Sequence, residues 1–176
     1  MAGSEALRIT ALEWIVVAAG LLAYVSSFLP WYTLTASVPI LGLTQSTNVN
    51  AWGSGFGAWF SVLLLVAAAA VVLASMVVGG RLRRPSTRSL ITLGLSALAF
   101  ITIVLRWATF PDAAGGLGRI GDLGDVQLGS FTFGNAFRVT SGASVGLYLG
   151  LSAAVAALAA SSLTFRAAAR EWHSVP

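Results

Sequence analysis

Few side chains in this sequence have the chemistry that catalysis needs. The chain has one histidine, His173, close to its C-terminus, and it contains neither cysteine nor lysine. General acid–base and nucleophilic catalysis depend mostly on such groups, placed within hydrogen-bond reach of one another. We therefore expect a protein that is not an enzyme and that needs no cofactor.

Two loop motifs look like binding sites but have the wrong context. Residues 116–121 read G-x-G-x-x-G and are followed by Asp122. They follow an apolar stretch rather than a strand and open no helix, so they do not indicate a dinucleotide site. Asp112, Asp122 and Asp125 offer oxygen ligands, but their spacing matches no known calcium loop. We expect no metal site here.

Two charged residues lie at the ends of apolar stretches. Arg106 is about one turn from the end of the third stretch, where it could extend to the lipid headgroups or pair with Asp112. Because a guanidinium binds planar anions through two parallel hydrogen bonds, Arg106 is also a candidate contact for an anion or a lipid headgroup. Glu13 opens the first stretch, where a negative charge favours a helix N-terminus.

The elements that carry these residues are four long apolar stretches, at about 12–32, 53–78, 89–110 and 143–165. A helix needs about 20 residues to cross a hydrocarbon core of about 30 Å. The chain of 176 residues is 57% hydrophobic and only 9% charged. This composition predicts an all-α membrane protein, a bundle of four transmembrane helices arranged as two hairpins in one integral membrane domain.

Arginines define the expected orientation. The dense cluster between the second and third stretches lies in the inner loop 79–88 and comprises Arg81, Arg83, Arg84 and Arg88. Short loops rich in basic residues stay in the cytoplasm, so this cluster should set the topology and contact anionic lipids. Both termini are then cytoplasmic in a bacterial plasma membrane, and the outer loops are 33–52 and 111–142. The basic residues adjoin membrane segments, so we expect no nucleic-acid partner.

Aromatic residues and two loop segments refine the outer side. Most tryptophans, together with Tyr32, lie near expected helix ends, where the headgroup layer favours their rings. Residues 126–133 alternate apolar and polar side chains, as a strand does, and residues 32–38 offer a partner. The two outer loops are thus compatible with a small extracytoplasmic β-rich cap.

A stripe of small residues follows the fourth stretch at intervals of four. It consists of Gly142, Gly146, Gly150 and Ala154. Helices in lipid associate largely through close backbone contact along such stripes. The stripe is therefore a helix-packing face inside the bundle, or an interface with another membrane protein or a second copy of this chain.

Two short patches carry a resemblance. Phe28-Leu29-Pro30-Trp31-Tyr32, followed by an uncharged loop and Asn50-Ala51-Trp52-Gly53, resembles a loose group of small actinobacterial four-span proteins of unknown function. The resemblance implies a plasma-membrane protein and supplies no catalytic residues. Because some small membrane proteins of actinobacteria serve envelope machines, it favours a link to lipid transport or cell-wall assembly.

The sequence therefore predicts a non-enzymatic accessory or assembly subunit of a larger envelope complex. Its partners would be membrane lipids and other integral membrane subunits, or further copies of itself. The alternative is a small transporter or channel, although such proteins usually place ionisable groups near the membrane midplane. A lipid-modifying enzyme would have to work with Arg106, Arg138 and the three loop aspartates.

Overall fold

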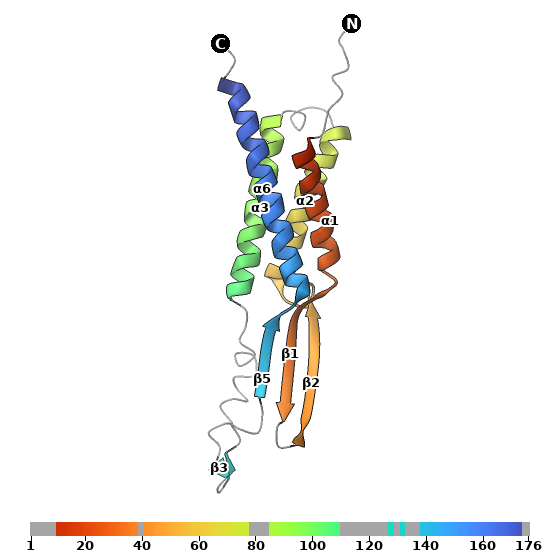
Figure 1. Cartoon of the computed structure of the whole chain (residues 1–176), viewed down its shortest axis with the longest axis vertical. Coiled ribbons are helices and arrows are strands. Elements are labelled where there is room, and N and C mark those ends of the chain that lie inside the picture. Colours follow the sequence, from red (N-terminus) through yellow and green to blue (C-terminus); the bar gives the residue numbers. More distant parts are fainter. Residues whose placement is uncertain are drawn as a thin grey trace.

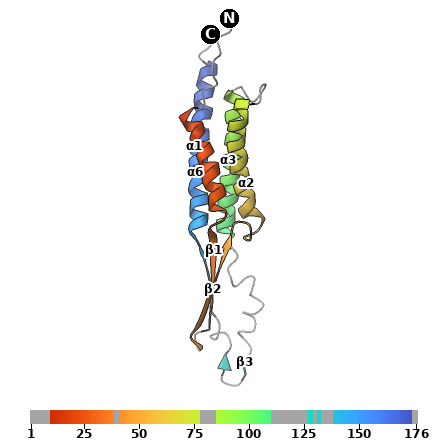
Figure 2. The ribbon, with the colours of Figure 1, turned by 90° about the vertical axis from the view of Figure 1, so that its right-hand side faces the viewer.

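Four helices lie side by side and a β-sheet extends from one end of them (Figure 1). The computed structural model describes residues 10–38, 41–77, 85–109, 127–128, 131–132 and 138–173. α1 begins, and α6 ends, at the end of the helices away from the sheet (Figures 1 and 2). The described part of the chain is mostly helical, but it is not the all-α structure that the composition predicted.

α1 spans Ala11–Ser26 and is shorter than the predicted 12–32. Thr10 and Glu13 form a capping box that satisfies the first N–H groups of the helix. At the other end, the hydroxyls of Ser26 and Ser27 donate to carbonyls one turn back. Pro30 follows and disfavours helical geometry in the residue before it. The chain leaves the helix at that point and becomes a strand.

The other three helices are long enough and apolar enough to cross a membrane. α2 spans Phe56–Val77, α3 spans Pro85–Ala108 and α6 spans Val145–His173. α3 begins four residues before the predicted position 89, because Pro85 is well placed in a first helical turn, where its missing N–H costs nothing. This shift brings Arg88 from the predicted inner loop into the helix.

Each helix has two main neighbours: α1 and α3 both pack against α2 and α6. The contacts rely on small residues, which allow close backbone approach. Gly20 of α1 is the closest case: a Cβ atom added there would lie 2.6 Å from Cβ of Ala69 and 2.8 Å from the carbonyl oxygen of Leu65, both on α2. The buried core continues past the helix ends to Trp31 and Tyr32.

The sheet has three antiparallel strands in the order β2-β1-β5. β1 spans Pro30–Val38, β2 spans Leu43–Asn50 and β5 spans Arg138–Ala143. The prediction of a strand at 32–38 is confirmed, but its partners are 43–50 and 138–143 rather than 126–133. Within that last segment, the short strands β3 (Gln127–Leu128) and β4 (Phe131–Thr132) pair only with each other.

The strand pairing and two short connections attach the sheet to the helices. Tyr32 of β1 lies opposite Val49 of β2 and Ala143 of β5. β1 follows α1 after a short turn, and β5 enters α6 through a single residue, Ser144, whose N–H donates to the carbonyl of Trp31 at 2.8 Å. The sheet is therefore coupled directly to two helices, and both predicted outer loops contribute strands to it.

Candidate functional site

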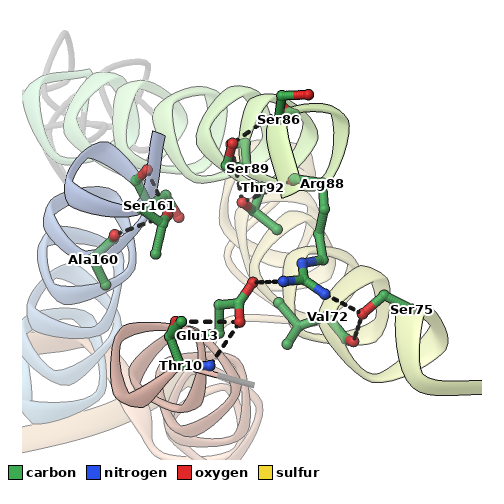
Figure 3. A network of polar contacts seen from close by, with 11 residues as sticks. Thr10, Glu13, Val72, Ser75, Ser86, Arg88, Ser89, Thr92, Ala160 and Ser161 are labelled. Atoms are coloured by element: carbon green, nitrogen blue, oxygen red, sulfur yellow. Dashed lines mark hydrogen bonds and ion pairs between the residues drawn. The ribbon is translucent and has the colours of Figure 1, made fainter. Parts of the chain in front are cut away.

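A buried ion pair connects two helices at the end away from the sheet (Figure 3). Nη2 of Arg88 in α3 lies 2.5 Å from Oε1 of Glu13 in α1, and both side chains are less than a tenth exposed. The other carboxylate oxygen of Glu13 accepts the N–H of Thr10 at 2.9 Å. One carboxylate thus caps α1 and neutralises the arginine.

Arg88 also contacts a third helix. Its Nη1 donates to the hydroxyl of Ser75 in α2 at 3.0 Å, and that hydroxyl donates to the carbonyl of Val72 (Figure 3). Removing two charges from water is expensive, and these contacts offset much of that cost. The sequence predicted that Arg88 contacts anionic lipid, whereas the residue is only 7% exposed and its side chain points into the bundle.

A cavity adjoins the ion pair. It has a volume of about 220 Å³, and its polar lining includes Thr10, Glu13, Arg88 and Thr164. The pair has no net charge, so the cavity carries no excess charge from these two residues. Ser96 of α3 and Ser161 of α6 lie further into the bundle, with their hydroxyl oxygens 3.4 Å apart.

Arg106 occupies the opposite end of α3. Its guanidinium carbon lies 5.5 Å from the ring centroid of Tyr32, a cation–π contact. Its stem packs on the start of α2, where a Cβ atom added at Gly57 would be 3.7 Å from Cδ of Arg106. Burial raises the pKa of the Tyr32 phenol, and the positive charge of Arg106 opposes that rise. Asp112, the ion-pair partner considered as one of two alternatives for Arg106, is outside the described residues.

Three members of the small-residue stripe are packed inside the structure, and the fourth is not. A Cβ atom added at Gly146 would lie 2.6 Å from Cδ1 of Trp31, and one added at Gly150 would lie 3.1 Å from its Cζ2. Ala154 is fully buried. Gly142 instead belongs to β5, and an added Cβ there would meet nothing within 4 Å. The main contact of Gly146 and Gly150 is thus a tryptophan of this chain.

Trp31 and Tyr32 are buried, at 0% and 2% exposure, although the sequence placed them in the headgroup layer. The indole N–H of Trp31 donates to the carbonyl of Ser26 at 2.9 Å, which satisfies its polar group inside the core. Among the tryptophans whose side chains the structure describes, Trp14, Trp52 and Trp107 are exposed. The aromatic positions near helix ends therefore serve two purposes, core packing and surface contact.

Ser144 lies in a G-x-S-x-G sequence at residues 142–146, a spacing that hydrolases use for a nucleophile. In those enzymes the serine occupies a strained strand-to-helix turn beside a histidine. Among the described residues, no residue other than glycine has a positive φ angle. The sole histidine of the chain, His173, lies at the far end of α6. Ser144 accepts the N–H of Leu147 through its carbonyl and starts α6.

The remaining predicted residues lie outside the described part of the chain. These are Arg81, Arg83 and Arg84 of the arginine cluster, and residues 112–125 with the glycine motif and the three aspartates. Within the described part, no group of histidine, cysteine, aspartate or glutamate residues could hold a metal ion. Gly20 and Ser75 were not predicted as site residues, because the local sequence gives no distinctive signal at either position.

No protein-family model matches this chain, and no curated protein is significantly similar to it. The resemblance carried by residues 28–32 and 50–53 stays a prediction.

Proposed function

We propose that this protein is a non-enzymatic subunit of a bacterial envelope complex, in which membrane helices hold a β-sheet as a contact surface for a partner protein. The observation that carries the proposal is the attachment of the sheet: β1 leaves α1 through a short turn, and β5 enters α6 through one residue. A sheet fixed in this way has a defined orientation relative to the membrane. Preorganisation of that kind lowers the entropic cost of binding.

Four membrane crossings are part of this proposal. α1 has 16 residues and would be about 24 Å long, somewhat less than a typical hydrocarbon core. One end of α1 lies beside the first turn of α3, where Glu13 pairs with Arg88, and the other end leads into the sheet. Between these ends, α1 packs along α2 and α6. Local thinning of the bilayer accommodates such a difference in length. With the arginine-rich loop in the cytoplasm, the sheet is on the outer side.

The surface of the sheet suits a protein partner. β2 reads Leu-Thr-Gln-Ser-Thr-Asn-Val-Asn, and its residues 43–48 are exposed on both faces. It contains no charged residue, so contact with another protein would not require desolvation of a charge. Among the described strands, β2 pairs only with β1, and its outer edge presents backbone groups of the kind that strand addition uses.

The buried polar residues favour this function over transport. Polar side chains that line a transport path must be free to bind the substrate. Here the hydroxyls of Ser61 and Ser75 donate to carbonyls of their own helix at 2.6 Å, and Thr92 donates in the same way at 3.1 Å. The Glu13–Arg88 pair is likewise neutralised internally.

Copurification after mild detergent extraction from the native host tests the proposal. The double variants Gln45→Lys/Thr47→Lys and Thr44→Lys/Ser46→Lys place charges on opposite faces of β2, at positions that are all exposed. We expect at least one variant to lose a partner that the wild type retains, with an unchanged melting temperature. Retention of every partner by both variants, or substrate flux in liposomes containing only this protein, would contradict the proposal.

A further inference from the structure

We infer that Arg106 binds the phosphate of a phospholipid headgroup at the sheet end of the helices. This inference concerns a lipid ligand and goes beyond the proposed partner contact. It rests on the surroundings of one guanidinium group.

The two arginines described in α3 differ in how their charge is balanced. Arg88 has a carboxylate, that of Glu13, at 2.5 Å. Arg106 makes no ion pair with any residue that the structure describes; its described neighbours are the Tyr32 ring and the first turn of α2. An arginine in a membrane helix is costly, and such residues usually pair with a counter-ion. A bound anion would supply the counter-ion that none of the described residues provides.

The hydrogen-bonding groups of Arg106 support the same conclusion. Its Nε is buried and has no hydrogen-bond partner within the described residues. Neither Nη atom of Arg106 is among the buried side-chain atoms that lack a partner, so the Nη atoms are the donors that a ligand can reach. Its position near the C-terminus of α3 offsets part of the charge, but backbone carbonyls at a helix end balance only about half a unit charge. A phosphate can accept two parallel hydrogen bonds from a guanidinium.

The level of Arg106 along the helices identifies the source of the phosphate. Exposed aromatic residues surround this end of the helices, namely Trp52 at 42%, Phe56 at 64% and Trp107 at 52%. Phe56 also contacts the rings of Trp59 and Phe60. Aromatic side chains of this kind mark the headgroup layer of a membrane. The phosphate that is abundant in that layer belongs to lipid, which favours a phospholipid over free phosphate.

The cation–π contact with Tyr32 holds the guanidinium in place. Tyr32 is 2% exposed and belongs to the central strand, so its ring cannot move without disturbing the sheet. The arginine stem also packs against α2 at Gly57, where an added Cβ atom would lie at van der Waals distance. An arginine fixed before binding loses less side-chain entropy when it binds an anion. Lysine would keep the charge but would lose the planar, two-point geometry.

The test is binding of phosphatidylglycerol to the purified full-length protein, measured by native mass spectrometry in detergent. We expect Arg106→Gln to weaken the tightest lipid-binding event about tenfold, the loss expected for a charge-assisted hydrogen bond. Arg106→Lys should give a smaller but measurable loss. Arg166→Gln is the matched control, because it removes the same charge from an exposed position in α6 and should change this event less than about twofold.

Four results would overturn the inference. Equal affinities of the wild type and the Arg106→Gln variant would exclude Arg106 as the ligand. An equal loss in the Arg166→Gln variant would reveal a general charge effect. A tenfold gain in the Asp112→Asn variant would identify Asp112 as the counter-ion. Inorganic phosphate should not displace the lipid at equal concentration, since displacement would assign the site to free phosphate. Circular dichroism of each variant verifies that it is folded.

Discussion

The carboxylate of Glu13 satisfies two different requirements at once, since it caps α1 and pairs with Arg88. A glutamate at the third position of a helix commonly stabilises that end of the helix, which the sequence predicted. The second role depends on α3 beginning at Pro85, which brings Arg88 beside it. Local sequence defines the cap, and tertiary packing supplies the ion pair.

Replacing Glu13 should therefore be costly. Glu13→Gln leaves the guanidinium of Arg88 buried without its negative partner, and we expect a loss of about 3–5 kcal/mol in the free energy of unfolding. The double variant Glu13→Gln/Arg88→Met removes both charges and should recover a large part of that loss. Denaturation of the purified protein in detergent measures both values. A single variant as stable as the wild type would show that the pair contributes nothing to the fold.

At the scale of elements, α6 and β1 meet through glycine. A Cβ atom added at Gly146 would lie 2.8 Å from the carbonyl oxygen of Pro30 as well as against Trp31. The neighbouring backbone cannot move without disturbing the start of β1. The small-residue stripe in α6 is thus a contact with a strand and its tryptophan, as well as with other helices.

Gly146→Ala should accordingly destabilise the protein by about 1–3 kcal/mol, the usual cost of overpacking. Gly94→Ala is the matched control, because Gly94 also lies within a helix and an added Cβ there would meet nothing within 4 Å. Alanine at position 94 should be neutral or stabilising by up to about 1 kcal/mol. Melting temperatures in detergent compare the two variants. Equal effects would place Gly146 outside the packed core.

The sequence predicted which segments form helices better than it predicted where those helices end. Long apolar stretches identify α2, α3 and α6, because only helices of that length satisfy their backbone groups in lipid. The predicted end of α1 was wrong by several residues, because the hydrophobic run continues past the helix into Trp31 and Tyr32. These two residues belong to strand β1. Pro30 begins that strand.

The candidate sites depended on long-range pairing that no local pattern reveals. β1 pairs with β5, which lies about 100 residues further along the chain. The partnership of Arg88 with Ser75 and the contact of Trp31 with Gly146 join residues from separate elements. Arg106 was recognised from the sequence because a charge in an apolar helix is unusual by itself.

For the whole molecule, the orientation in the membrane is the property on which the proposed function of the sheet depends. We expect a membrane-impermeant thiol reagent to label Ser46→Cys in intact cells, since Ser46 is exposed on β2. Ser86→Cys, in the first turn of α3, should be labelled only after the cells are opened. The wild type has no cysteine, so each variant carries a single thiol. Labelling of position 86 but not 46 in intact cells would reverse the orientation.

The central place of β1 also determines the order in which the sheet is assembled during translation. β1 and β2 are adjacent in the chain and can pair as soon as the first half has been synthesised, whereas β5 follows only after α3. Until residues 138–143 have been translated, one edge of β1 has no strand from its own chain. The last of these three strands to be translated therefore closes the sheet, and a ribosome that stalls before residue 138 leaves that edge of β1 open.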